Sequence, residues 1–315
     1  MSLEHDPDNY LIEAILWERQ TVVLLAREKV GKSLLSLQMA CSLSCGEALF
    51  GEYEILEPMQ VLYIQTESTR SETIERLKNM TGNNGLTWNP DNFYLYSTHS
   101  MALDTQEGYD HLLGLLHEYH LKPRVIFVDP LYMSMQGGLT DDLASRHMSS
   151  HLRQLADTFE AAMVVNHHEH RPKKDQKGDW IDEGDASIMG SFVWKAFPNH
   201  IIHLRLRPDG LRSLECTTQR SSRVIKDLRL ELVQPHPLYY RIHGTPDHMP
   251  YVDTVRKWVL NRSKPVCAKT IIDGTGLSRS AVMKSLSYLS DQRNKVLYKV
   301  NPGRRPTLYA PVNGV

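Results

Sequence analysis

The tripeptide Gly31-Lys32-Ser33 lies between an apolar run and a stretch that favours a helix. A strand, a tight turn with inward N–H groups and a helix N-terminus together form a site for phosphate. In such a loop the glycine admits the phosphates close to the backbone, the lysine reaches the β- and γ-phosphates, and the serine hydroxyl ligates Mg²⁺. The residues predicted to hold the nucleotide are Ala26, Glu28, Lys29, Val30, Gly31, Lys32, Ser33 and Leu34.

One position departs from the usual pattern of a phosphate loop. Ala26 stands where a glycine is usual, so this position must adopt a backbone conformation that is open to an L-residue. The other interpretation is an ordinary helix start that happens to contain Gly-Lys-Ser. Further residues are needed to decide between the two.

Four polar residues decide, because each follows or ends an apolar run that we expect to be a strand: Glu67, Asp129, Asn166 and His167. Ligands of open α/β sheets bind at the carboxyl ends of parallel strands, where these side chains would meet. Glu67 is then a candidate base for the attacking water, Asp129 a Mg²⁺ ligand through water, and His167 a γ-phosphate sensor. Singly, the carboxylates could cap loops and His167 could be a satisfied edge histidine. Together with Lys32 they predict binding of ATP and Mg²⁺.

The cluster His167-His168-Glu169-His170 also has a second interpretation, because histidines and carboxylates bind zinc. Four consecutive residues at the end of an extended strand cannot all converge on one ion. A loop that senses the nucleotide is the better account of this cluster.

Strands and helices alternate along the first two thirds of the chain. We expect strands at 21–25, 61–65, 93–96, 124–129 and 162–166, with helices at 32–45, 71–80, 107–119 and 144–160. This alternation predicts an α/β fold with a mostly parallel sheet and helices on both faces. From 201 to 232 shorter alternating strands predict an antiparallel extension of that sheet.

Prolines then divide the chain. We expect an ATPase domain over residues 1–234, a proline-rich linker over 235–250 and a small domain over 251–315. In the last domain helices are expected at 251–261 and from 268, followed by a turn at 274–277. Ser278 would cap a third helix, and two strands would flank a wing at 301–306. This order resembles a winged helix-turn-helix.

The total charge of −1 conceals an asymmetry. Residues 253–315 carry twelve Lys and Arg against three acids, a net charge of +9, which leaves −10 for the remainder. A basic domain on an acidic body suggests a polyanion such as DNA, although a solvated lysine-rich surface or a winged helix for protein contacts remains open. The candidate DNA contacts in this domain are Arg279, Ser280, Lys284, Arg304 and Arg305.

A polar stretch, 171–183, directly follows the expected sensor. In a ring it would face the central channel and contact single-stranded DNA through Arg171, Lys173, Lys174 and Lys177. A surface loop without such a role is the alternative.

Composition limits the protein class. The hydrophobic fraction is 41% and the charged fraction 23%, with no apolar stretch long enough to span a membrane. The N-terminus MSLEHDPDNY is polar, unlike a signal peptide, and the four cysteines show no pairing pattern. We therefore expect no membrane partner and a cytoplasmic location.

The motifs resemble those of RecA-like ATPases, and among them the RepA-type hexameric helicases of plasmids and mobile elements. The resemblance extends over residues 21–232 and includes AREKVGKSLLSLQMACSLSCGEALFG, VLYIQTES, RVIFVDPLYMSM, MVVNHHEH and GDASIMGS. It implies that Glu67 is the catalytic base and His167 the γ-phosphate sensor. It also implies a ring, a hexamer in this family, in which Arg220 reaches the neighbouring subunit's ATP, with Arg207 and Arg223 as rivals.

The sequence departs from that family at two places. Phe192-Val193-Trp194 follows GDASIMGS where relatives often have an acidic residue, and Thr218 stands where some have a lysine. Both positions bear on the subunit interface rather than on the ATP site.

The expected function is that of a ring-forming ATPase that translocates on or unwinds DNA, in replication or mobile-element maintenance. One alternative is a DNA-binding regulator or initiator that uses ATP as an assembly switch. The other is an ATPase scaffold that acts on protein partners.

Overall fold

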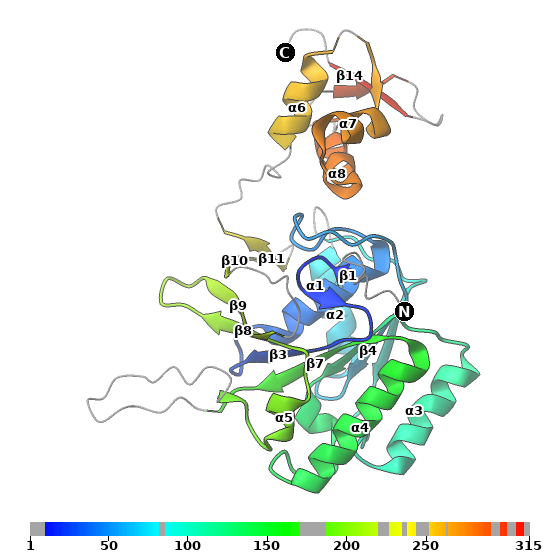
Figure 1. Cartoon of the computed structure of the whole chain (residues 1–315), viewed down its shortest axis with the longest axis vertical. Coiled ribbons are helices and arrows are strands. Elements are labelled where there is room, and N and C mark those ends of the chain that lie inside the picture. The colour runs from blue at the N-terminus through cyan, green and yellow to red at the C-terminus, as the bar shows by residue number, and fades with distance from the viewer. Residues whose placement is uncertain are drawn as a thin grey trace, which may run out of the picture. The chain divides into compact units, whose positions relative to one another are not determined.

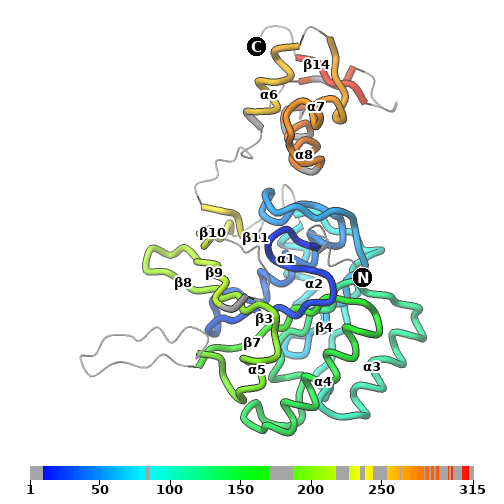
Figure 2. The backbone as a smooth tube through the Cα atoms, viewed as in Figure 1, coloured from blue at the N-terminus to red at the C-terminus, as the bar shows by residue number. Residues whose placement is uncertain are grey.

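A computed structural model of the chain describes residues 10–81, 86–170, 187–219, 227–234, 238–243, 252–262, 264–290, 297–300 and 307–311. The chain forms two compact units, drawn as a ribbon in Figure 1 and as a backbone tube in Figure 2. The first comprises residues 1–46 and 55–243, and the second comprises 47–54 and 244–315. Among the described residues, no helix is long and apolar enough to cross a membrane.

A nine-stranded sheet forms the centre of the first unit, in the order β11-β10-β9-β8-β3-β7-β6-β4-β5. The strands from β8 to β5 in this order are parallel, which confirms the predicted α/β fold with a mostly parallel sheet. These strands are β3 (Thr21–Ala26), β4 (Val61–Gln65), β5 (Phe93–Ser97), β6 (Val125–Asp129), β7 (Ala162–His168) and β8 (His200–Leu206).

Helices cover both faces of this sheet. α3 (Gln106–Glu118), α4 (Asp142–Phe159) and the short α5 (Val193–Ala196) pack their apolar residues against one face, in a core that includes Val23, Ile64, Val128 and Val165. α1 (Lys32–Cys45) and α2 (Arg70–Thr81) contact each other, and α1 packs on the strands from the other face (Figure 1). The inner strands β3, β4, β6 and β7 are therefore buried on both sides, which is why their sequences are largely apolar runs.

The antiparallel extension consists of β9 (Arg212–Gln219), β10 (Leu228–Val233) and β11 (Tyr239–Ile242). β11 lies inside the segment 235–250, where the prolines predict a linker, and it pairs with β10. Its formation has a physical reason, since Tyr240 is only 1% exposed and its side chain is packed while the other three residues of this edge strand are partly buried. The first unit thus ends at His243.

The second unit contains three helices and a small antiparallel sheet among its described residues. These are α6 (Val252–Leu260), α7 (Ala268–Thr275), α8 (Arg279–Leu289) and the strands β12 (Val266–Cys267), β13 (Leu297–Lys299) and β14 (Leu308–Pro311). As expected, the Ser278 hydroxyl accepts a hydrogen bond from the Ala281 N–H at 3.2 Å at the start of α8. The turn begins later than expected, because Gly274 remains helical where α7 packs closely on Trp258.

Other elements carry little sequence signal. The pair β1 (Tyr10–Ile12) and β2 (Leu16–Trp17) and the 3₁₀ turn η1 (Leu131–Ser134) are two to four residues long. Periodicity cannot identify segments of that length.

Candidate nucleotide-binding and hydrolysis site

The phosphate loop, residues 27–31, joins β3 to α1 at the carboxyl end of the parallel strands. Gly31 has φ of +108°, a conformation that favours glycine. Ala26 is the last residue of β3, fully buried, with a negative φ, and paired with His168. An alanine is therefore compatible with the position where a glycine is usual.

Lys32 begins α1 and lies at the centre of the site. Its side chain is buried, and Nζ donates a hydrogen bond to the His167 carbonyl oxygen at 2.8 Å. Burial lowers the pKa of Lys32 to about 8, although the carboxylates of Asp129 and Glu67 favour the charged form. At neutral pH the group is an ammonium that can pair with a phosphate.

This lowered pKa predicts how nucleotide binding depends on pH. A bound phosphate stabilises the ammonium, so above the free-protein pKa of about 8 binding must take up a proton at Lys32. We expect the affinity for MgADP to fall by up to about tenfold per pH unit above that value, because a linked proton changes log K by one per unit. Calorimetric titration in buffers of different ionisation enthalpy measures this uptake. An affinity that stays constant from about pH 7.5 to 9.5 would contradict it.

The two predicted Mg²⁺ residues lie together. The Ser33 hydroxyl donates to Asp129 Oδ1 at 3.1 Å, and Asp129 is 1% exposed. Its other oxygen accepts from the Tyr63 hydroxyl at 2.7 Å and lies 3.4 Å from Gln65 Nε2. A hydroxyl and a carboxylate in this geometry fit Mg²⁺, which prefers few protein oxygens and retains waters.

Tyr63 and Gln65 are site residues that sequence reasoning missed. Both are buried on β4, and Gln65 pairs with Asp129 in the parallel register of β4 and β6. Residues two apart on a strand share a face, so Tyr63 and Gln65 point to the same side of β4, next to the strand that ends in Asp129. This spacing is the signal that could have identified them.

Glu67 extends from the loop after β4 and is exposed. Gln65 orients this loop, since its Oε1 accepts the backbone N–H groups of Glu67 at 2.9 Å and Ser68 at 3.1 Å. The Tyr132 hydroxyl, from η1, donates to Glu67 Oε1 at 3.3 Å. Burial and the Glu67 carboxylate raise the pKa of Tyr132, so the phenol remains a donor.

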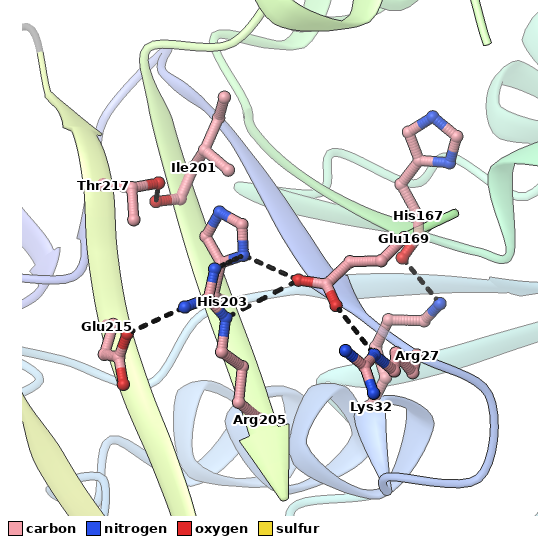
Figure 3. A network of polar contacts seen from close by, with 9 residues as sticks. All are labelled: Arg27, Lys32, His167, Glu169, Ile201, His203, Arg205, Glu215 and Thr217. Carbon is pink, nitrogen blue, oxygen red and sulfur yellow. Dashed lines mark hydrogen bonds and ion pairs between the residues drawn. The ribbon is translucent and has the colours of Figure 1, made fainter. Parts of the chain in front are cut away.

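The ring of His167 does not approach Lys32. It is fully buried against Trp194, at 5.9 Å between ring centroids, while only its carbonyl faces the lysine (Figure 3). Burial lowers the pKa of His167 to about 3, so the ring is neutral. Side chains alternate along a strand, and Asn166 and His168 accordingly face the other side. Asn166 accepts from Ser36 of α1, and His168 packs on Tyr132.

A charged network connects the phosphate loop to β8 and β9 (Figure 3). Glu169 accepts from His203 Nδ1 at 2.8 Å and lies 3.8 Å from both Arg27 and Arg205, while Arg205 lies 3.4 Å from Glu215. Burial alone would raise the pKa of Glu169, but the hydrogen bond from His203 and the charges around it lower it. The carboxylate stabilises a contact between the loop and the strand pair at neutral pH.

Within the described ranges, no group of three or more His, Cys, Asp or Glu is arranged to hold a metal. Glu169 is directed at His203 and the arginines rather than at a shared ion.

Some of the remaining predicted residues lie in the described part of the chain and the others lie outside it. Arg207 follows β8, half-exposed, with a guanidinium nitrogen 3.9 Å from Glu215, and Arg279 and Lys284 lie on α8 with Ser280. Outside the described residues lie Arg171, Lys173, Lys174, Lys177, Arg220, Arg223, Arg304 and Arg305.

Comparison with known proteins bears on this site. Residues 2–174, more than half of the chain, match the family described as AAA domain. Among solved structures, the fold is similar to a KaiC-like protein from the hyperthermophilic archaeon Pyrococcus horikoshii OT3, with a TM-score of 0.50 and 11% identity. The similarity covers 74% of this chain and 94% of that chain, and it concerns the fold alone. No curated protein matches the sequence.

The mostly parallel sheet, with a phosphate loop between β3 and α1, has the fold of a RecA-like P-loop ATPase. The match over more than half of its length shows that the chain belongs to the AAA domain family of ATPases.

Proposed function

We propose that this ATPase hydrolyses ATP in a ring and couples the reaction to movement on DNA, as a helicase or translocase of the RepA type in the cytoplasm. The observation that carries the hydrolytic part is that the Asp129 and Glu67 carboxylates both lie close enough to Lys32 to favour its charged form. A module that binds ATP without hydrolysing it would need Lys32 and Asp129, but it would not need Glu67 as a base for the attacking water.

Each residue has a role in this mechanism. Lys32 and the N–H groups of the phosphate loop bind the β- and γ-phosphates, and Ser33 with Asp129 holds Mg²⁺, which offsets charge on the phosphates. Glu67 accepts a proton from the water that attacks the γ-phosphorus, while the bond to the ADP oxygen breaks. Because the His167 ring lies against Trp194, we assign γ-phosphate sensing to Asn166, which faces α1, and to His168, which packs on Tyr132.

The second unit supports a DNA partner. Its three helices, with Ser278 capping α8, and its strands β13 and β14 have the order of a winged helix-turn-helix. The segment 253–315 has a net charge of +9, and α8, which carries Arg279 and Lys284, corresponds to the helix that enters a major groove in such domains. Phosphate contacts by Arg304 and Arg305, and contacts to single-stranded DNA by Lys173, Lys174 and Lys177, belong to the same proposal.

The test is the rate of ATP hydrolysis with and without single-stranded DNA, at low and moderate salt, with Lys32→Ala as the blank. We expect strong stimulation by DNA that weakens with salt, because each neutralised phosphate of a single strand makes the slope of log K against log salt steeper by about 0.7. A slow rate that DNA leaves unchanged would exclude a motor and favour an ATP-switched regulator. Stimulation only by a protein fraction would favour the scaffold.

Assembly is tested by mixing two inactive variants. If Arg220 completes the neighbour's site, Arg220→Ala and Lys32→Ala each lose activity, and a mixture regains part of it at interfaces that combine an intact site with an intact arginine. If Arg220→Ala is fully active, the role passes to Arg207 or Arg223, which the same mixing experiment examines.

A further inference from the structure

The last strand of the first unit contacts the phosphate loop. Tyr240, on β11, is 1% exposed, and its hydroxyl donates to the Val30 carbonyl oxygen at 3.0 Å. The same hydroxyl lies 3.5 Å from the Gly31 carbonyl oxygen. Two successive carbonyls of the loop therefore face one phenol that is distant in sequence.

Gly31 has a steric partner as well as a conformational requirement. A Cβ at this position would lie 1.9 Å from the Tyr240 hydroxyl oxygen, which is closer than any stable contact. The space beside the motif glycine is thus occupied by Tyr240. The motif alone predicts a glycine here for the close approach of phosphates, and the packing of Tyr240 is a second, independent constraint.

The direction of the two carbonyls determines the direction of two N–H groups. In a trans peptide the carbonyl and the next residue's N–H point in opposite directions. With the Val30 and Gly31 carbonyls turned toward Tyr240, the N–H groups of Gly31 and Lys32 point away from it. In a phosphate loop these N–H groups bind the phosphates. The hydrogen bond from Tyr240, which is not part of the loop, therefore helps to orient the N–H groups that would bind the phosphates.

Tyr240 is itself firmly held. The Gln38 side chain, on α1, donates to the Tyr240 carbonyl at 2.8 Å and accepts from the Tyr240 N–H at 2.7 Å. Burial raises the pKa of the Tyr240 phenol, so it stays protonated and remains a donor. The Arg212 guanidinium lies over the ring, at 5.9 Å from its centroid.

We propose that Tyr240 is a positioning residue that presets the phosphate loop for the diphosphate of a nucleotide. It acts mainly through the Val30–Gly31 peptide, whose carbonyl it holds at 3.0 Å, since the Gly31 carbonyl also accepts from the Leu35 N–H of α1 at 3.1 Å. Without the hydroxyl the Val30–Gly31 peptide can rotate, and binding must then restore its orientation. The inference rests on the proposed nucleotide site.

The test is Tyr240→Phe, which removes one hydroxyl and retains the ring. We expect binding of MgADP, measured by calorimetry, to weaken by about threefold to tenfold, the usual range for one lost hydrogen bond. The KM for ATP should rise by a similar factor with a smaller change in kcat, because the loop is preset before chemistry. Gln38→Met, which removes both bonds to the β11 backbone, should act in the same direction.

Tyr94→Phe is the matched control. The Tyr94 hydroxyl also donates to a backbone carbonyl, that of Asp91 at 2.9 Å, but on β5 at the opposite edge of the sheet. It should leave MgADP affinity within about twofold. In thermal unfolding, the rise in Tm produced by MgADP should shrink in Tyr240→Phe and not in Tyr94→Phe.

The outcomes are distinguishable. If wild-type protein binds MgADP and Tyr240→Phe binds it equally well, the positioning role is wrong and the nucleotide site stands, even if the variant is less stable. An equal loss in Tyr94→Phe would also overturn the role, since the effect would then be general. If the wild-type chain binds no nucleotide, the proposed function fails and this inference with it.

Discussion

Replacing Glu67 by glutamine is expected to lower kcat for ATP hydrolysis by about 10²–10⁴-fold, the usual contribution of a general base. The amide cannot accept the proton of the attacking water. It can still occupy the position beside Tyr132, whose hydroxyl donates to the glutamate oxygen. ATP binding should therefore stay within about twofold, because the phosphate loop, Lys32 and the Mg²⁺ residues are unchanged. Single-turnover hydrolysis and a binding titration on the same preparation give both quantities.

Glu75→Gln, at an exposed position of α2, is the control for the loss of one negative charge. It should retain the wild-type rate. A Glu67→Gln enzyme with more than about a tenth of the wild-type kcat would show that another group activates the water.

Replacing Lys32 by alanine should abolish measurable turnover through two effects. Loss of a charged hydrogen-bond donor, worth about 1.5–3 kcal/mol, should weaken ATP binding by roughly 10- to 150-fold. The transition state loses a cation near the transferred phosphoryl group, which should lower kcat by a further factor of about 10² or more. Binding by calorimetry and saturating steady-state rates separate the two.

Lys78→Ala, at an exposed position near the end of α2, controls for the loss of one positive charge. Lys32→Ala should also lose the pH dependence of MgADP affinity above about pH 8, since the titrating ammonium is gone. If that pH dependence persisted in Lys32→Ala, another group would be responsible for it.

Long, uniformly buried elements can be predicted from the sequence. The helix at 32–45 and the strand at 61–65 have the expected bounds, because one lacks Gly and Pro and the other is an unbroken apolar run. The meeting of Lys32, Ser33 and Asp129 follows from a general rule, that ligands bind at the carboxyl ends of parallel strands. That rule needs only the order of elements, which the sequence contains.

Features that depend on side-chain direction or on distant packing cannot be predicted in this way. The motif predicts that His167 faces the nucleotide. Side chains alternate along β7, however, so Asn166 and His168 lie on the face toward α1, and the His167 ring lies on the other face, against Trp194. Tyr132 and Tyr240 belong to the site through contacts across 65 and 210 positions of sequence, which no local pattern contains. The prolines around β11 conceal it, since its pairing with β10 and its packing on α1 make it a strand, and neither is visible in the local sequence.

The late position of β11 has a consequence for how the protein is made. A ribosome synthesises the phosphate loop early, but Tyr240 emerges only after a further 209 residues have been added. The nascent chain can form β3, α1 and the parallel strands β4 to β7 while the loop still lacks this tyrosine. A chain that ends at residue 174, where the family match ends, would in addition leave the β3 edge without β8. Such a fragment exposes a buried strand edge, which promotes aggregation. The earliest complete binding site on the ribosome therefore coincides with the completion of the first unit at His243.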